Sequence, residues 1–436
     1  MLGLMAADKD FGVAGMATPA FEVRNREAAE EEPPGGLRYV ARQPIMDLRG
    51  RVHGYELLFR SGPEAAFRGD GNLATRTMLD NTVIYGLERL TGGLPAFVNC
   101  TSESLIEDLV HVLPPSMTVL EILESLEITP GLIRACRKLK ASGFRLALDD
   151  FVWKPGVEPL VEVADYIKVD VALTGAAERR VLLKRLAPFT VALIAEKVET
   201  QEEYRQACEE GFNLFQGYYF CRPVLMRNSK VPANRLSHIE ILQLLRCDSI
   251  DLRKLTRLVK RDASLTYRLL RLVNSPMCAV RQEVRSIQSA LLAVGEDSFR
   301  RIATLAITSE LGANQPAEVL RMAFMRGRFC ELAAQECELD PTEQYLLGML
   351  SLLAAMLQRP MDELAPALPL REEIRSALSG EPNRERSLLA WLENHEHGDW
   401  AECDMLAEVH GLNQEDLVER YAEAVVWAEA ALMAAG

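Results

Sequence analysis

The stretch TVLEILESLEITPGLIRACRKLKASGFRLALDD, residues 118–150, contains one complete strand–helix–strand unit. Its two ends, TVLEI and FRLALDD, are short apolar runs of the kind that form buried strands. The segment between them, TPGLIRACRKLKASG, has apolar residues at helical spacing and closes on a glycine, a common helix stop. A strand, a helix and a second strand in this order predict a parallel β/α unit.

The same alternation of apolar runs and helix-like segments continues over residues 37–223. No Gly-rich GxGxxG turn follows any of the runs, which disfavours a dinucleotide-binding sheet. The eight strand candidates are LRYVARQPI, RVHGYELLF, PAFVN, TVLEI, FRLALDD, DYIKVD, TVALIAE and FNLFQGYYF. Strands that alternate with helices form parallel sheets. We therefore predict an α/β fold of the TIM-type (β/α)8 barrel class, with an open doubly wound sheet as the alternative.

The pattern changes on both sides of this region. Residues 1–36 lack periodicity and end in EAAEEEPPGG, which is typical of a flexible leader. A barrel domain over 37–225 is followed by a linker-like stretch at 226–236. From there apolar residues recur at helical spacing, beginning with SHIEILQLL. We predict a second, all-α helical domain over 237–436.

Composition and charge exclude several classes of function. The formal net charge is −14 and no block of Lys and Arg occurs, which argues against a nucleic acid partner because polyanion binding needs clustered cations. The longest uncharged apolar run, at 346–357, is shorter than the roughly 20 residues of a membrane span. The first residues become charged too early for a secretory signal. The nine cysteines are scattered, as is typical of buried thiols in a reducing compartment. We expect a cytoplasmic protein without a membrane segment.

Polar side chains end most of the predicted strands. In a β/α barrel these ends meet at one mouth, where such folds carry their chemistry. The polar residues at or just after these strand ends are Glu56, Asn99, Glu121, Asp149, Asp150, Lys168, Asp170, Glu196, Glu199 and Gln216. Each alone could be a helix N-cap or a solvated side chain. Together, crowded carboxylates would repel one another unless cations neutralised them. Oxygen ligands favour Mg²⁺ or Mn²⁺, and two adjacent aspartates could flank a pair of such ions.

These motifs also resemble the EAL domains, the cyclic di-GMP phosphodiesterases. YELLFR (55–60) is similar to their Glu-Ala-Leu signature, with Leu57 in place of the alanine. The supporting motifs occur in the family's order: RQPI (42–45), VNCT (98–101), LEILES (120–125), LALDDF (146–151), IKVD (167–170), AEKVET (195–200) and FQGYYFCRP (215–223). The resemblance covers about residues 37–225, and it too implies a TIM-type barrel.

The resemblance implies a role for each motif residue. One metal ion would be held by Glu56, Asn99, Glu121 and Asp149, and a second by Asp149, Asp150 and Glu196. Lys168 would orient or polarise the attacking water, and Glu196 would assist as general base. Gln43, Arg60 and Gln216 would bind substrate, with Arg60 on a phosphate. Glu124, Asp170 and Glu199 would support the site.

One loop departs from the family pattern. EAL domains carry a Gly-Thr-Gly-type loop after the aspartate pair, whereas FVWKPG (151–156) stands here. Glu124, which matches the glutamate that anchors that loop, is present, but Leu123 replaces the threonine beside it. Without the glycines the backbone loses its positive-φ turns, and Trp153 needs another contact, for which the helical domain is one candidate. The replacement of the Gly-Thr-Gly-type loop is expected to affect metal affinity, turnover or dimer contacts.

The helical half resembles the HDOD domain, an output domain related to HD hydrolases. The clearest segments are LTRLVKRDASLTYRLLRLVNSP, SIQSALLAVGEDSFRRIATLAI and EQYLLGMLSLLAAML. HD hydrolases bind metal through a His-Asp pair, and no histidine in this chain is followed by aspartate. We therefore expect no hydrolysis in this half, but contact with a protein partner. His395 and His397 are expected to lie in a solvated loop.

The resemblance to paired EAL and HDOD domains implies a bacterial, YuxH-like signalling protein. Its leading function is a magnesium- or manganese-dependent phosphodiesterase that opens cyclic di-GMP to linear pGpG, and a homodimer is possible. The alternative is a receptor that binds cyclic di-GMP without turnover, or a scaffold that binds only a protein. The complete acidic set favours the enzyme, and the altered loop favours the receptor.

Overall fold

The computed structural model describes residues 39–60, 87–221, 238, 240–242, 244–245, 251–280, 282–368 and 370–435. Within these ranges the side chains of Tyr39, Arg60, Glu336 and Ala367 are not described. The predicted leader and linker lie outside the described residues, so the predicted domain boundaries stay a prediction.

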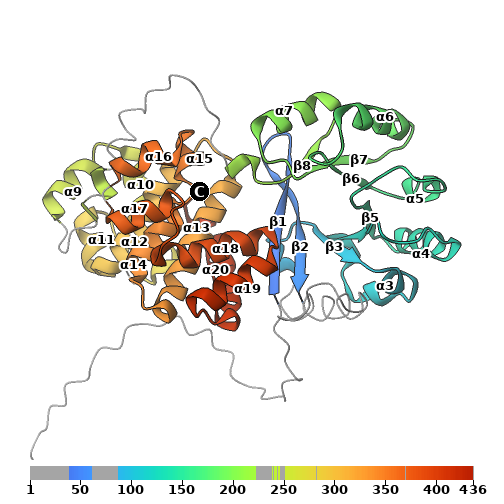
Figure 1. Cartoon of the computed structure of the whole chain (residues 1–436). Helices are drawn as coiled ribbons and strands as arrows, with labels where there is room; N and C mark the ends of the chain where they lie inside the picture. Colours follow the sequence, from blue (N-terminus) through green and yellow to red (C-terminus); the bar gives the residue numbers. More distant parts are fainter. Residues whose placement is uncertain are drawn as a thin grey trace, which may run out of the picture. The chain divides into compact units, whose positions relative to one another are not determined.

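A closed barrel of eight strands forms the first half of the described chain, in sequence order around the ring (Figure 1). The strands are β1 (Tyr39–Asp47), β2 (Val52–Arg60), β3 (Ala96–Cys100), β4 (Thr118–Ile122), β5 (Arg145–Leu148), β6 (Tyr166–Asp170), β7 (Ala192–Glu196) and β8 (Leu214–Gln216). This confirms the predicted TIM-type barrel.

The first strand runs against the others, which a regular (β/α)8 pattern does not predict. β1 pairs antiparallel with both β2 and β8, whereas the remaining neighbours are parallel. The cause is the short connection between β1 and β2. Asp47 Oδ1 accepts hydrogen bonds from the backbone amides of Arg49 and Arg51, and Gly50 takes φ +69°. Such a tight turn reverses the chain, because a parallel connection needs a dozen or more residues.

Helices follow the parallel strands and cover the outside of the barrel. They are α2 (Leu87–Thr91), α3 (Ser102–Ile106), α4 (Pro130–Ala141), α5 (Glu158–Val161), α6 (Ala176–Leu186) and α7 (Gln201–Glu210). Threonine side chains cap three of them at the N-terminus: Thr101 accepts from the amide of Ser104, Thr129 accepts from the amide of Leu132, and Thr200 forms a capping box with Glu203. These caps fix where each strand-to-helix loop ends, next to the barrel mouth.

Alternation along the strands separates an apolar layer from a polar layer inside the barrel. The lower layer is a buried cluster of Ile45, Phe97, Val119, Ala147, Tyr166, Ile194 and Leu214. Because side chains two positions apart share a face of a strand, the next inward positions place Asn99 after Phe97, Glu121 after Val119 and Glu196 after Ile194. The apolar layer thus forms a floor under the polar mouth.

The second half of the described chain is all-α, as predicted. Its helices are α9 (Leu252–Val259), α10 (Ala263–Val273), α11 (Ile287–Val294), α12 (Glu296–Leu311), α13 (Ala317–Ala333), α14 (Pro341–Leu350), α15 (Leu353–Leu357), α16 (Met361–Leu364), α17 (Glu372–Leu378), α18 (Ser387–His397), α19 (Trp400–His410) and α20 (Gln414–Ala435). None of the helices in the described ranges combines the length and hydropathy of a membrane span.

Two histidines of α18 overturn the expectation of a solvated loop. Both belong to the helix, and His395 is fully buried, with its Nε2 atom 3.2 Å from the carbonyl oxygen of Val40 in β1. Its ring lies against the rings of Trp391 and Tyr421, with centroids 4.8 and 4.5 Å apart. His397 is exposed and stacks on a barrel residue described below. The expectation was wrong because Val40 and Tyr421, which also contact His395, are distant in sequence.

Candidate active site

The ammonium group of Lys168 lies at the centre of the barrel mouth, surrounded by carboxylates. Its Nζ atom is 2.7 to 3.0 Å from oxygens of Asp149, Glu121, Glu196 and Glu56. Lys168 and Glu121 are almost inaccessible to solvent, with side-chain exposures of 1% and 0%. Five strand ends thus bring one ammonium group and four carboxyl groups together at one point. The sequence predicted these residues at one mouth, and the structure brings them together.

Neutral amides hold the Glu56 carboxylate from two sides. Asn99 Nδ2 donates to Glu56 Oε1 at 3.2 Å, and Gln216 Nε2 donates to Glu56 Oε2 at 2.7 Å. Lys168 donates to the same Oε2 at 3.0 Å. Each oxygen of Glu56 therefore accepts a hydrogen bond, which fixes the plane of the carboxylate.

Burial and mutual repulsion shape the protonation of the cluster. Burial raises the pKa of Glu196 to about 8, and Asp149 and Glu56 add to the rise while Lys168 opposes it. Burial and the neighbouring Glu56 also raise the pKa of Glu121. For Glu56 itself burial is outweighed by Lys168 and the amide donors, and its pKa is lowered. Burial opposes the charged form of Lys168, yet the carboxylates raise its pKa. Crowding therefore favours uptake of protons or of a cation by the carboxylates of the cluster.

Several oxygens at the mouth are buried without a hydrogen bond. Within the described part of the chain, Asn99 Oδ1, Glu121 Oε2 and Glu196 Oε2 accept none. Buried polar atoms are usually satisfied, so a group of orphaned acceptors points to a missing cation or donor. No set of three or more His, Cys, Asp or Glu side chains among these residues is already arranged around a metal position. The carboxylates instead converge on Lys168.

The remaining predicted acidic residues lie at the edge of this cluster. Asp150 has φ +39°, and its Oδ1 is 3.8 Å from Nζ of Lys197. Lys197 is 2.6 Å from Asp170 Oδ2, and Asp170 also accepts from two backbone amides of the following loop. Glu199 is exposed, just before the capping residue of α7. Sequence reasoning missed Lys197, although the motif AEKVET shows a cation between two strand-end glutamates.

The loop after Asp150 packs on the barrel itself. The ring of Trp153 lies 6.2 Å from that of Phe151 and 6.3 Å from that of Phe189, and the guanidinium of Arg185 lies 5.6 Å from its centroid. Arg185 belongs to α6, and Phe189 follows it. The alternative that Trp153 contacts the helical domain is therefore wrong. Apolar neighbours within the barrel compensate for the bulky side chain.

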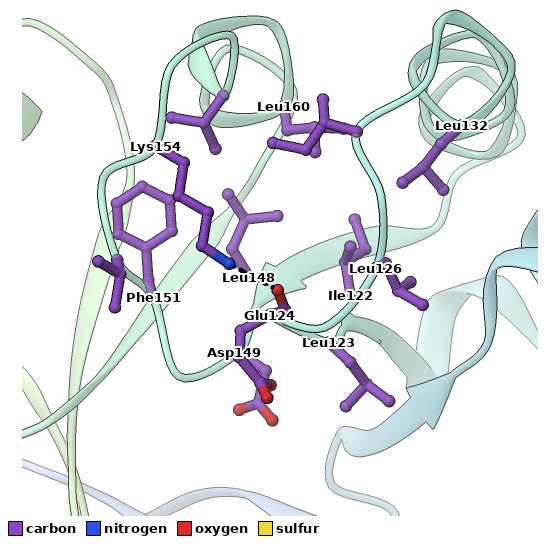
Figure 2. Close-up of a pocket in the computed structure, with 13 residues that line it drawn as sticks. Ile122, Leu123, Glu124, Leu126, Leu132, Leu148, Asp149, Phe151, Lys154 and Leu160 are labelled. Atoms are coloured by element: carbon purple, nitrogen blue, oxygen red, sulfur yellow. Dashed lines mark hydrogen bonds between the residues drawn. The ribbon is translucent and has the colours of Figure 1, made fainter. Parts of the chain in front are cut away.

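A small apolar pocket lies between this loop and the β4–α4 connection (Figure 2). Leu126, Leu132, Leu148 and Leu160 are among the residues that line it, and Asp149 lies at its edge. Lys154 Nζ donates to the backbone carbonyl of Glu124 at 2.9 Å, which ties the loop to the other connection. Glu124 thus contacts this loop through its main chain.

The predicted substrate residues are only partly described. The side chain of Arg60 lies outside the described residues. Gln216 is buried and Gln43 is half-buried, and Gln216 Nε2 donates to Gln43 Oε1 at 3.0 Å. Both amides therefore belong to the wall of the mouth beside Glu56.

Comparisons with known families agree with this architecture. A family model described as the EAL domain matches residues 73–223, and one described as the HDOD domain matches residues 232–371. The EAL match begins after β2, so the assignment of Glu56 depends on its motif and its position at the mouth.

Relatives cover nearly the whole chain. The uncharacterized protein YuxH of Bacillus subtilis is 34% identical over 89% of this chain and 97% of its own length. The cyclic di-GMP phosphodiesterase CdgJ of Vibrio cholerae is 32% identical over 90% of this chain and 92% of its own. Among solved structures, a calcium and cyclic di-GMP complex of BlrP1 from Klebsiella pneumoniae is 26% identical, with a TM-score of 0.37, over 45% of this chain and 58% of that one. With both domains matched and two full-length relatives above 30% identity, the protein belongs to the EAL–HDOD, YuxH-like family.

Proposed function

We propose that the barrel is a metal-dependent phosphodiesterase that opens cyclic di-GMP to linear pGpG. One observation carries the proposal: four carboxylates, three of them buried, lie within 3.0 Å of the Lys168 Nζ atom at the mouth of an EAL-type barrel. A fold that only bound a neutral or anionic ligand would gain nothing from crowding carboxylates there. The similarity to CdgJ over both domains supports the substrate.

The donor set fits divalent cations. Asn99 Oδ1, Glu121 Oε2 and Glu196 Oε2 are buried oxygens without hydrogen bonds in the described structure, and hard oxygen donors suit Mg²⁺ or Mn²⁺. The proposed first ion is held by Glu56, Asn99, Glu121 and Asp149, and the second by Asp149, Asp150 and Glu196. Bound ions would supply positive charge to the phosphate and make a water more acidic.

The chain's own residues supply the proton transfers and the orientation. Lys168 keeps its proton, since the carboxylates raise its pKa, and its Nζ can donate to a water or a phosphate oxygen. Burial raises the pKa of Glu196 to about 8, so Glu196 acts as a base only in its deprotonated form, in which Oε2 can accept a proton from the attacking water. Gln43, Arg60 and Gln216 bind the substrate, and Glu124, Asp170 and Glu199 support the loops.

The helical half would act as a non-catalytic output domain. No histidine in the chain is followed by aspartate, which removes the metal pair of HD hydrolases. We propose that this half engages a protein partner of unspecified identity. A cytoplasmic location and a homodimer also stay predictions.

The second candidate is a receptor that binds cyclic di-GMP without turnover. The altered loop favours it, because Trp153 and Lys154 are fixed on Phe189 and Glu124 and leave no glycine hinge between Phe151 and Pro155.

Chromatography of the reaction products separates the two candidates. Purified protein is incubated with cyclic di-GMP and Mg²⁺ or Mn²⁺, with Glu56→Ala as control. Linear pGpG from the wild type alone supports the enzyme. Intact substrate, with binding detected by calorimetry, supports the receptor, and neither product nor binding would refute both.

A further inference from the structure

A chain of hydrogen bonds links the barrel mouth to the C-terminal end of α18 in the helical half. Gln43 Nε2 donates to the backbone carbonyls of Glu396 and His397, at 3.3 and 3.2 Å. Gln43 Oε1 accepts from Gln216 Nε2 at 3.0 Å, and that same nitrogen donates to Glu56 Oε2 at 2.7 Å. Two side chains therefore connect the last turn of α18 to a carboxylate of the candidate active site.

The end of α18 determines the direction of every bond in this chain. Backbone carbonyls can only accept hydrogen bonds, so Gln43 must turn its NH₂ group toward α18 and its oxygen toward Gln216. Gln216 must then present its own NH₂ group, whose two hydrogens serve Gln43 and Glu56. If Gln43 were free to flip, Gln216 could flip too and place its oxygen against the Glu56 carboxylate, where like partial charges repel.

Contacts from both halves hold the end of α18 in place. Arg326 of α13 donates to Glu396 Oε1 and Oε2 at 3.1 and 2.6 Å, and both side chains are buried. From the barrel, Tyr218 OH donates to the Glu396 carbonyl at 2.7 Å. The Tyr218 ring stacks on that of His397 with centroids 4.0 Å apart. The carbonyl that orients Gln43 is thus fixed by a buried ion pair on one side and a phenol on the other.

We propose that the carbonyls of Glu396 and His397 are positioning groups of the barrel mouth. By setting the orientation of Gln43 and Gln216, the helical half holds Glu56 in its metal-binding geometry, and a displacement of α18 lowers metal affinity and turnover. The consequence for turnover depends on the proposed phosphodiesterase function, whereas the orientation of the two amides does not.

The structure offers a variant that moves α18 without touching the mouth. Gly398, which ends α18 with φ +74°, would place an added Cβ 2.8 Å from Cδ1 of Leu58 in β2. In Gly398→Ala, either the end of α18 or the flexible end of the Leu58 side chain must therefore shift. Gly411 ends α19 with φ +65° and has no neighbour within 4 Å of an added Cβ. Gly411→Ala imposes the same backbone strain without the push, and is the matched control.

The first test uses metal-free, full-length protein. The protein is deuterated and labelled with ¹⁵N-glutamine, and the side-chain NH₂ signals of Gln43 and Gln216 are assigned through Gln43→Ala and Gln216→Ala. Gly398→Ala is expected to shift both signals, and Gly411→Ala neither. Adding Leu58→Ala, which removes the clashing Cδ1 and leaves the Cβ of residue 58 at 3.9 Å, should restore the wild-type signals. Unchanged signals in Gly398→Ala would overturn the inference, whatever the catalytic activity.

The second test measures Mn²⁺ affinity by calorimetry and, where pGpG forms, kcat and KM. Loss of a group that orients a metal ligand typically weakens metal binding or activity roughly 10–100-fold. We expect a loss of that size in Gly398→Ala, recovery with Leu58→Ala, and no loss in Gly411→Ala. Equal losses in both glycine variants would mean generic destabilisation and refute the inference. If the wild type forms no pGpG but Gly398→Ala still shifts the NH₂ signals of Gln43 and Gln216, the proposed phosphodiesterase function is refuted. The proposed positioning of the two amides by α18 is then still supported.

Discussion

Replacing Lys168 by methionine would leave the four carboxylates of the cluster without the ammonium group that they share. The change keeps the length of the side chain and removes the ammonium group that lies 2.7 to 3.0 Å from Asp149, Glu121, Glu196 and Glu56. A buried ion group that loses one partner typically destabilises a protein by about 3–5 kcal/mol. The folded state can limit this loss only by taking up a proton or a cation.

The free energy needed to protonate a glutamate gives a second estimate of the stability that Lys168→Met loses. Protonating a glutamate of ordinary pKa at pH 7 costs about 4 kcal/mol, which agrees with the range for a broken buried ion pair. We expect Lys168→Met to lower the free energy of unfolding by about 4 kcal/mol in EDTA, or the melting temperature by roughly 10 °C. Since the folded variant binds an extra proton relative to the unfolded chain, its deficit grows by about 1.4 kcal/mol per pH unit as pH rises.

The assay is urea unfolding at pH 6, 7 and 8 in EDTA and again with Mn²⁺. Lys197→Met is the matched control, because Lys197 is half exposed and its loss should cost about 1 kcal/mol or less. Mn²⁺ should recover part of the Lys168→Met deficit. A deficit below about 1 kcal/mol at pH 8 in EDTA would refute the view that the mouth is an over-charged anionic cluster.

Three further predictions test the site, the loop and the interface between the halves. Glu56→Ala or Asp149→Asn should abolish pGpG formation, and normal turnover by either variant, measured by chromatography, would contradict the assignment of the mouth. Trp153→Ala should lower the free energy of unfolding by about 2 kcal/mol, because it removes the contacts with Phe151 and Phe189; unchanged urea unfolding would show that the loop is not packed. Burial lowers the pKa of His395 to about 3, so as pH falls this histidine becomes protonated in the unfolded chain before it does so in the folded protein. The free energy of unfolding should therefore decrease by up to about 1.4 kcal/mol per pH unit below about pH 6.5. His395→Gln should remove that slope, and an unchanged slope would mean that His395 is not its source.

Strand periodicity explains why the mouth could be predicted from the sequence. Inward side chains recur every second residue, so a polar residue two positions after a buried apolar one must lie above the barrel floor. Glu121 after Val119 and Glu196 after Ile194 follow this rule. The convergence on Lys168 could not be predicted in the same way, because it depends on the radius of the closed barrel and on how four carboxylates share one cation.

Structural features that depend on contacts between residues far apart in the chain could not be predicted from the sequence. The direction of β1 depends on a short turn, and an apolar run has the same pattern in either direction. His395 is buried by Val40, which is 355 residues away, so local polarity gave the opposite expectation. The contact of Trp153 with Phe189 likewise depends on how α6 packs beside the loop. Local patterns predict which face a residue occupies, whereas its neighbours are set by the tertiary fold.

An anomalous difference map at the manganese edge, from crystals grown with Mn²⁺, tests the central claim most directly. We expect two peaks at the barrel mouth that share Asp149 as a ligand, one bound also by Glu121 and the other by Glu196. We further expect that Lys168 loses some of its present carboxylate contacts. A mouth without peaks at saturating Mn²⁺, with Lys168 still bound by all four carboxylates, would contradict a metal-dependent enzyme.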